Sequence, residues 1–442
     1  MAGILECPPQ EIATQLAAAG TTRAWIAPDA NGHWAASHPL LAPLARFLGE
    51  SPDQRGHEAV FLAAGVRSDA LLAVFLHHLD RGQAQGGVRR QPYPTLADFV
   101  SDGLRLAWGM GRKNALAGLW WSGGKGLIAE PPQLGGQAHT EHRRRVYLDF
   151  GDFVSSLDGC YVTAEDAGTL PEDVATLFER TRFVTCIPEA FGGSGNPSFA
   201  TARGVLCGIE AALQEVGSLR IAGARVLVQG AGNVGAALVD QLLEHDVGAV
   251  LLGEARVTRL HELSDRFDGA PVELRHTAPG DSSLLREPCD VLAPCALGGV
   301  LGPASIPELK TRIVCGSANN PLLDETRDAE ALRARGILYV PDYIVNRMGI
   351  VHCANEQHGR LHPDPEVERH LDPANPQGIP AVTRAVLRHA AEEGVATTVV
   401  AERMAAQLAL QPHPLYGTRA RAIVQALLRG DWHAGDCKPT QG

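Results

Sequence analysis

The sequence predicts an α/β fold of two domains, one of which is a doubly wound parallel sheet. At 442 residues the chain is too long for one ordinary core, and the usual size of domains suggests two of roughly 200 residues each. From Thr201 onward, short apolar runs alternate with segments of helical spacing. A glycine-rich turn joins the first of these runs to the next helix. We therefore expect two α/β domains with a cleft between them.

The second half of the chain begins with a βαβ unit. A helix over 201–216 precedes an apolar strand over 224–229, and after a glycine turn a second helix covers 234–245. Further short apolar strands are expected at 247–254, 291–296, 312–318 and 337–344. Strands of this kind that alternate with helices are typical of a parallel sheet with both faces covered.

The first half is a mixture of strands and helices. Residues 59–65 and 71–79 are apolar and strand-like, whereas residues 96–110 have apolar side chains at helical spacing. Residues 379–428 are predicted to form long Ala-rich helices, the last of which folds back onto the first domain. We assign residues 1–56 to an N-terminal extension of unknown role, 57–197 with 400–442 to a substrate-binding catalytic domain, and 198–399 to a nucleotide-binding domain.

Composition excludes several classes of protein. The chain is 45% hydrophobic and 20% charged, as in a globular protein, and its net charge of −11 argues against nucleic acid or an anionic membrane as a partner. It contains no apolar run of membrane-spanning length and does not begin like a signal peptide, which predicts a cytoplasmic protein. Its nine cysteines form no CxxC, so neither zinc nor disulfides are expected, and Cys295 and Cys315 are interpreted as small buried hydrophobes.

The clearest local motif is GxGxxG at Gly230, Gly232 and Gly235, directly between a strand and a helix. The first glycine permits a tight turn, the second lets backbone N–H groups approach a pyrophosphate, and the third allows close packing of the helix. The helix N-terminus, with Asn233 and Val234, then faces the anion. This pattern predicts a Rossmann-type dinucleotide-binding domain, whereas the alternative is a glycine turn that binds no ligand.

An acidic residue, Glu254, ends the following strand, where a carboxylate binds both hydroxyls of an adenosine ribose. Its position favours NAD over NADP, because a 2′-phosphate would meet a negative charge. Arg256, two positions on, favours the alternative cofactor NADP, since a guanidinium turned inward neutralises that phosphate.

Two further clusters carry ionisable side chains in glycine-rich surroundings. Lys113 and Lys125 flank what we interpret as a strand-like apolar segment that ends at Gly123 and Gly124. Burial lowers the pKa of a lysine from about 10.4, and an enzyme uses a lysine with a pKa of roughly 7 to 8 as a base. Surface lysines are the alternative. Glu165 and Asp166 stand between a strand and a glycine turn, where a helix cap or an exposed turn is the alternative.

Eight segments together resemble one enzyme family, that of the glutamate, leucine, phenylalanine and valine dehydrogenases. The segments are KNALAG, GGKG, TAEDAGT, GSGNPS, GAGNVG, APCALGGVL, GSANN and PDYIVN, which occur in the family's order from about His57 to the C-terminus. TAEDAGT, APCALGG and PDYIVN are most similar to the leucine dehydrogenase branch. The resemblance implies NAD-dependent oxidative deamination of an L-amino acid to the 2-oxo acid and ammonia, without a metal, by a homo-oligomer (a dimer or an octamer).

The same resemblance implies a role for individual residues. Lys113 would hold the substrate α-carboxylate, Lys125 would act as base towards the attacking water, and Asp166 would exchange protons with the amino group. The remaining matches place Gly86 and Gly87 against the substrate through their backbone, Asn346 near both nicotinamide and substrate, and Cys295, Ala296 and Asn320 at the cofactor.

Departures from the family pattern concern the substrate. Gln85 stands where glutamate dehydrogenases have a lysine and leucine dehydrogenases a leucine, and we expect it to line the far end of the pocket, with Met110 on the wall. This favours a neutral, bulky or aromatic side chain over glutamate. Trp120 and Trp121 are expected to pack in the core, while Arg347 and Met348 replace small residues near the nicotinamide. A glutamate dehydrogenase and an inactive NAD-binding regulator are the alternative readings.

Overall fold

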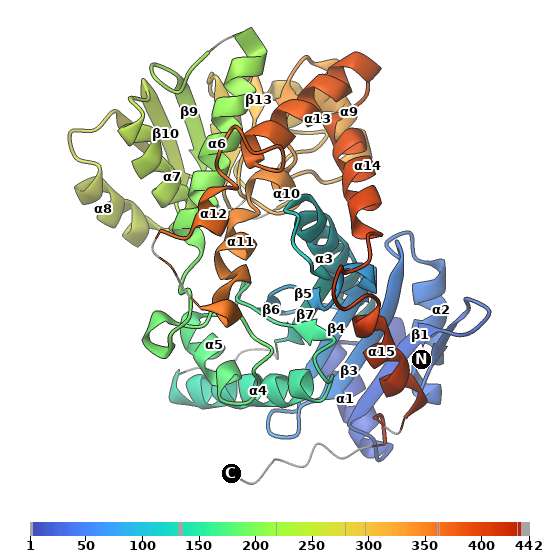
Figure 1. Cartoon of the computed structure of the whole chain (residues 1–442). Coiled ribbons are helices and arrows are strands. Elements are labelled where there is room, and N and C mark those ends of the chain that lie inside the picture. The colour runs from blue at the N-terminus through green and yellow to red at the C-terminus, as the bar shows by residue number, and fades with distance from the viewer. Residues whose placement is uncertain are drawn as a thin grey trace. The chain divides into compact units, whose positions relative to one another are not determined.

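The structure is a computed structural model that describes residues 3–130, 136–217, 219–278, 280–296, 298–359, 361, 363–430 and 432–434. The chain divides into two compact units, one made of Met1–Asn196 with Ala406–Gly442 and the other of Pro197–Ala405. Each unit contains one sheet with helices on it (Figure 1). Among the described residues, no helix is long and apolar enough to cross a membrane.

The first unit contains an eight-stranded mixed sheet in the order β2-β1-β3-β4-β7-β5-β8, with β6 paired to β7. Its strands are β1 Arg23–Pro28, β2 Trp34–Ala36, β3 His57–Ala64, β4 Leu71–His77, β5 Ala84–Gln85, β6 Val88–Gln91, β7 Ser122–Ala129 and β8 Tyr161–Val162. Its helices are α1 Pro9–Ala18, α2 Ala42–Glu50, α3 Leu96–Leu116, α4 Gly136–Ser155, α5 Pro171–Phe178 and α15 Arg419–Arg429.

Both faces of this sheet are covered by helices. Successive side chains of a strand point to opposite faces and therefore belong to two different cores. Phe61 and Val74 belong to a core with α4 and α15, whereas Leu62 and Phe75 belong to a second core with α1, α2 and α3. This explains why β3 and β4 read as continuous apolar runs rather than as alternating ones. β7 lies inside the sheet and is buried along its whole length.

Residues 3–56 are part of this layered structure. We treated them as an extension, but β1 pairs with β3 in antiparallel register from Arg23 opposite Ala63 to Ile26 opposite Val60. α1 and α2 cover one face of the sheet. α15 near the C-terminus covers the other face through Ala420, Val424 and Leu427.

One local prediction in this unit is wrong. The segment between Lys113 and Lys125 is not a strand flanked by the two lysines, because α3 continues to Leu116 and a turn follows. Lys113 therefore lies on the last turn of a helix, while Lys125 lies inside β7. The amide of Asn114 ties the end of α3 to the sheet by donating to the carbonyl of Ser122 (2.9 Å).

The second unit contains a six-stranded parallel sheet in the order β11-β10-β9-β12-β13-β14. Its strands are β9 Arg225–Gln229, β10 Ala249–Glu254, β11 Val272–His276, β12 Val291–Pro294, β13 Ile313–Val314 and β14 Leu338–Tyr339. Its helices are α6 Ser198–Gly217, α7 Asn233–Glu244, α8 Val257–Arg266, α9 Glu325–Ala334, α10 Asp342–Val345, α11 Met348–Ala354, α12 Pro365–Glu368, α13 Ile379–Glu393 and α14 Thr397–Ala409, whose last residues belong to the first unit.

This strand order runs 3-2-1-4-5-6 in chain order, which is that of a Rossmann sheet. The predicted doubly wound fold is therefore confirmed. The strand order reverses at β9, between β10 and β12, and ligands of such sheets bind beyond the carboxyl ends of the strands at this point. The edge strand β11 was not predicted, since its residues are half-buried or exposed and carry no apolar run.

Candidate active site

Lys125 is buried in the middle of the first sheet. It lies on β7 opposite Phe75 of β4, and its side chain is 4% exposed. The surrounding strand is SGGKGLIA, in which the small residues leave room for neighbouring backbones. A Cβ on Gly123 would lie 2.4 Å from the carbonyl oxygen of Ala107, and one on Gly126 would lie 2.6 Å from the ring of Phe150. The glycines therefore let α3 and α4 pack directly on the strand that carries the lysine.

Asp166 provides the counter-ion of Lys125. It follows β8 in the turn that ends at Gly168, and its Oδ2 lies 2.8 Å from the Lys125 Nζ. The same oxygen accepts a hydrogen bond from Nε of Arg89 (3.0 Å). Burial alone would raise the pKa of Asp166, but the two cations outweigh it and hold the pKa below its usual value. The carboxylate is therefore ionised.

Burial acts in the opposite direction on the lysine. It lowers the pKa of Lys125, against the pull of the Asp166 carboxylate, which favours the ammonium form. The positive charge of Arg89 lowers the Lys125 pKa further. A lysine whose pKa is lowered in this way is a better base near neutral pH than one on the surface.

Glu165 lies beside this pair and titrates differently. Burial raises its pKa to about 7, and the negative charge of Asp166 adds to the effect. The backbone of Glu165 pairs with Val88 of β6. Two adjacent carboxyl groups thus have pKa values far apart, an arrangement that is frequent at catalytic sites.

Arg89 was not predicted from the sequence. It lies two positions after Gly87, in the short strand β6, and its side chain is 16% exposed. Its Nη1 also lies 3.3 Å from Oδ1 of Asp102 on α3. The only sequence feature that could have indicated it was an arginine shortly after two glycines. Such a pattern is too common in proteins to identify a site residue.

Gly86 and Gly87 are required by close packing. A Cβ on Gly86 would lie 1.8 Å from the carbonyl oxygen of Gly124, and one on Gly87 would lie 2.3 Å from that of Glu165. Any side chain here would push β5 and β6 away from β7 and from the loop that carries Asp166. These glycines thus bring the predicted catalytic residues together.

The predicted substrate residues lie on the elements next to Lys125. Gln85 on β5 pairs with Gly123 of β7 and is 1% exposed. Its side-chain oxygen is buried and has no hydrogen-bond partner among the described residues. Met110 on α3 is half-buried, and a Cβ on Gly86 would lie 3.0 Å from its Cγ. Lys113 is half-buried one turn further along α3.

In the second unit the glycine motif forms the expected cradle. Gly230 directly follows β9 and has a φ of +102°, a conformation that side chains disfavour. A Cβ on Gly235 would lie 2.0 Å from the carbonyl oxygen of Gly230, so α7 packs directly on the turn. Gly232, by contrast, faces open space and caps α7 without a side-chain hydrogen bond. The first N–H groups of α7, at Asn233 and Val234, are thus left for an anion.

Glu254 ends β10 next to this cradle, as predicted. Its Oε1 accepts hydrogen bonds from the backbone N–H of Ala255 (3.0 Å) and Arg256 (2.9 Å) and from Nε of Arg256 (3.2 Å). These contacts hold the pKa of Glu254 below its usual value against the effect of burial. No described residue donates to its Oε2, so this oxygen can accept further hydrogen bonds.

The other predicted cofactor residues follow β12, β13 and α10. Cys295 is half-buried, not fully buried as expected, and Ala296 after it is exposed beside Gly230. Asn320 is exposed in the turn after β13. The amide nitrogen of Asn346 donates to Oδ1 of Asn319 (2.9 Å), while its buried Oδ1 has no partner among the described residues. A carboxamide N–H of a nicotinamide fits such an acceptor.

The structure shows the burial and the contacts of two residues that depart from the family pattern. Trp120 is not in the core, because it is 40% exposed, and the centre of its ring lies 4.4 Å from the guanidinium carbon of Arg81 and 5.8 Å from that of the His413 ring. Arg347 is fully buried and donates to the carbonyl of Gln377. Burial lowers its pKa to about 9.

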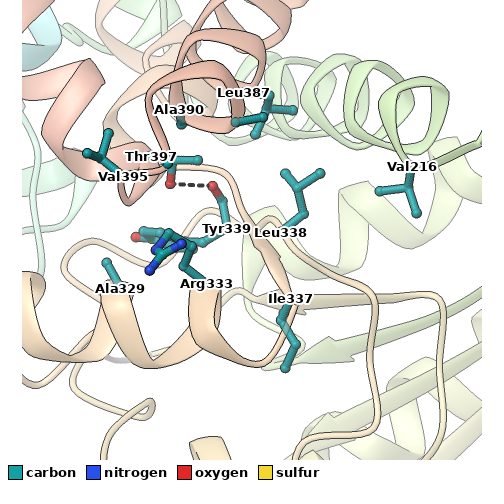
Figure 2. A pocket seen from close by; sticks show the side chains of 13 residues that line it. Val216, Ala329, Arg333, Ile337, Leu338, Tyr339, Leu387, Ala390, Val395 and Thr397 are labelled. Carbon is teal, nitrogen blue, oxygen red and sulfur yellow. Dashed lines mark hydrogen bonds between the residues drawn. The ribbon is translucent and has the colours of Figure 1, made fainter.

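Two other features of the described residues lie outside these sites. Glu58, His78 and Asp80 come close enough to hold a metal ion, but Arg421 already pairs with Glu58 (2.7 Å) and Asp80 (2.9 Å). A cavity of about 250 Å³ in the second unit lies between α9, β14 and α13. Figure 2 shows its lining, which is mostly apolar apart from Arg333 and Thr397, and the hydrogen bond from the Thr397 hydroxyl to the carbonyl of Tyr339 (2.7 Å). None of the predicted site residues lines it.

Comparison with known proteins shows which sequences the chain is similar to. Residues 192–411 match the family model described as Glutamate/Leucine/Phenylalanine/Valine dehydrogenase, and residues 71–183 match its dimerisation domain. The chain is 37% identical to leucine dehydrogenase of Geobacillus stearothermophilus over 69% of its own length and 79% of the relative's. It is 36% identical to valine dehydrogenase of Streptomyces albus, over 80% and 93% of the two chains.

Solved structures agree with these matches. The fold is similar to that of L-tryptophan dehydrogenase from Nostoc punctiforme, with a TM-score of 0.64 and 30% identity over 83% of this chain and 98% of that one. The family implies a nicotinamide cofactor, and the cradle around Gly232 and Glu254 fits one. The chain therefore belongs to the glutamate/leucine/phenylalanine/valine dehydrogenase family and is an amino-acid dehydrogenase.

Proposed function

We propose that this enzyme oxidises a neutral L-amino acid to its 2-oxo acid and ammonia with NAD as the hydride acceptor. The observation that carries the proposal is the buried ion pair between Lys125 and Asp166, whose Nζ and Oδ2 atoms are 2.8 Å apart. It combines a lysine of lowered pKa with an ionised carboxylate, which are the base and the proton acceptor that oxidative deamination requires.

The residues divide the reaction between them. Lys113 pairs with the substrate α-carboxylate, and Asp166 takes a proton from the α-ammonium so that the amine can release a hydride from Cα. Bound NAD would accept that hydride. Lys125 then takes a proton from a water molecule, and the oxygen of that water attacks the imine carbon. Proton return to the nitrogen lets the carbinolamine collapse to the 2-oxo acid and ammonia.

The side chains around the cofactor also have assigned roles. Gly230, Gly232 and Gly235 would cradle the pyrophosphate at the start of α7, and Glu254 would bind the ribose. Asn346, with Cys295, Ala296 and Asn320, would hold the nicotinamide end. The match of residues 71–183 to a dimerisation domain supports a homo-oligomer, which we propose to be a dimer or an octamer in the cytoplasm.

A preference for NAD over NADP follows from Glu254. A 2′-phosphate beside its carboxylate should cost more than about 1.4 kcal/mol, which is a factor of about ten in kcat/KM. Arg256 already contacts Glu254 and partly offsets this repulsion. Steady-state kinetics with both cofactors should show the preference, and Arg256→Ala should widen it. Comparable kcat/KM values for NAD and NADP in the unmodified enzyme would refute the assignment.

The unpaired oxygen of Gln85 supports a substrate with a polar group at the tip of its side chain. An amide cannot neutralise a second carboxylate as an ammonium can, which disfavours glutamate. Leaving a buried acceptor unsatisfied costs about 1 to 3 kcal/mol, so a donor such as the indole N–H of tryptophan or the hydroxyl of tyrosine would be favoured. The similarity to a tryptophan dehydrogenase agrees with this choice.

A panel of leucine, phenylalanine, tryptophan and glutamate tests the proposed substrate class through NADH absorbance. We expect glutamate to be the poorest substrate, and Gln85→Leu to raise kcat/KM for leucine relative to tryptophan by about tenfold. Gln83→Leu is the matched control, because that amide already donates to the carbonyl of Gly159 (2.7 Å). An unchanged ranking in Gln85→Leu would show that Gln85 does not face the substrate, and a preference for glutamate would overturn the proposed class.

A further inference from the structure

A continuous chain of charged and polar groups extends from the proposed base to α3. It runs from Lys125 through Asp166 and Arg89 to Asp102, which also accepts a hydrogen bond from the hydroxyl of Tyr93 (2.7 Å). We infer that Arg89 is a positioning residue that fixes Asp166 against Lys125 and sets the pH at which Lys125 works as a base. The inference rests on the function proposed above, because it takes Lys125 as that base.

The geometry at Asp166 is asymmetric. Lys125 and Arg89 both contact Oδ2, and no described residue donates to Oδ1. A carboxylate held through one oxygen presents the other in a fixed direction. The Oδ1 atom is then the oxygen that exchanges a proton with the substrate nitrogen, while Oδ2 remains part of the ion pair.

Arg89 is itself held from both sides. Its Nε contacts Asp166, and its Nη1 lies 3.3 and 3.4 Å from the two oxygens of Asp102. The planar guanidinium can reach both carboxylates at once, whereas an ammonium is a single point charge. Asp102 is anchored in turn by Tyr93, whose pKa is raised by burial and by the nearby carboxylate, so that its hydroxyl remains a donor.

The charged groups acting on Lys125 come from three elements. Asp166 in the loop after β8 and Asp102 on α3 favour its ammonium form, whereas Arg89 on β6 opposes it. Arg89 and Lys125 share one oxygen atom and so lie within about 6 Å of each other, a range over which like charges shift pKa values strongly.

The other titratable groups on the elements packed against β7 have less effect on the pKa of Lys125. On β4, His77 has a pKa well below its usual value because it is buried, so it is neutral. Tyr161 on β8 has a pKa raised by burial and is neutral as well. Glu165, beside Asp166, titrates at about pH 7, and Lys113 on α3 remains in place in every variant below.

Two substitutions should move the acid limb of the pH profile of kcat/KM in opposite directions. This limb is the loss of kcat/KM at low pH, where Lys125 becomes protonated. Arg89→Gln removes a positive charge, which raises the pKa of Lys125 and should shift the limb up by about one to two pH units. Asp102→Asn removes a negative charge, which lowers that pKa and should shift the limb down. Neither Arg89 nor Asp102 is among the groups that shift the pKa of Glu165, and the amine of the free substrate is the same in every variant, so the shifts report on Lys125. General damage to the fold would not produce opposite signs.

Arg90→Gln is the matched control, because Arg90 is the next residue of β6 and its buried side chain pairs with Glu130 (3.0 Å). It should lower thermal stability and leave the acid limb in place. Arg89→Lys keeps the charge and should restore the limb to near the wild-type pH with a lower kcat. If Arg89→Gln does not fold, Asp102→Asn and Arg89→Lys decide the question.

The possible results distinguish a failure of the inference about Arg89 from a failure of the proposed function. An acid limb that stays in place in Arg89→Gln, or moves in the same direction in Asp102→Asn, contradicts the inference while leaving Lys125 as the base. A shift of equal size in Arg90→Gln also contradicts it. Near-normal turnover in Lys125→Ala would instead overturn the proposed function itself.

Discussion

Replacing Lys125 by alanine is expected to reduce kcat by about two to four powers of ten, because the enzyme loses the base that activates water. Binding of NADH should remain near normal, since the glycine cradle and Glu254 belong to β9, α7 and β10 of the other unit. Turnover is followed by NADH absorbance, and cofactor binding by fluorescence titration of NADH.

Two controls make this experiment specific. Lys125→Arg keeps a cation for Asp166 but offers a group that does not deprotonate near neutral pH, so it should be nearly as inactive as the alanine variant. Lys310→Ala removes an exposed lysine of the second unit and should leave the rate unchanged. An active arginine variant would show that Lys125 is needed only for its charge.

Replacing Asp166 by asparagine is expected to damage both catalysis and stability. Catalysis should fall by about two powers of ten or more, because the amide cannot accept the proton of the substrate nitrogen. Lys125 and Arg89 would lose their shared counter-ion inside the protein, and removing one partner of a buried ion pair typically costs about 3 to 5 kcal/mol. Denaturant unfolding and steady-state turnover measure the two effects.

The pH dependence of this stability has a defined sign. The pKa of Asp166 is lower in the folded protein, so its contribution is fully present above the unfolded value of about 3.9 and is lost as the pH falls through the folded value. Asp152→Asn is the matched control, since Asp152 is likewise shared by Arg67 and Arg180 in the same unit. It should lose stability but keep its turnover. A fully active Asp166→Asn enzyme would remove Asp166 from the mechanism.

Much of the fold could be predicted because local patterns determine it. The apolar runs of β3 and β4 and the βαβ unit around Gly230 are readable from periodicity and turn residues. By contrast, β5 and β8 have two residues each, and they exist because β5 pairs with β7 on one side and with β8 on the other. No sequence window contains that information. The helix over 96–116 was predicted too short, since the apolar segment after Lys113 is equally compatible with a strand.

The site was predictable residue by residue but not as an arrangement. Lys125, Asp166 and Glu254 stand in recognisable motifs, whereas the contact between Lys125 and Asp166 depends on the pairing of distant strands. Arg89 lies in no motif that we recognised, and its role is visible only from its contacts. Trp120 was placed in the core on hydrophobicity alone, but an aromatic ring at the surface also packs against a cation, as this one does against the buried Arg81.

The most direct measurement of the central claim counts the products formed by the unmodified enzyme. A neutral L-amino acid and NAD should give NADH, the 2-oxo acid and ammonia in equal amounts, because one hydride transfer precedes one hydrolysis. Formation of NADH without ammonia, or the absence of turnover with every neutral amino acid while NADH binds, would contradict the account.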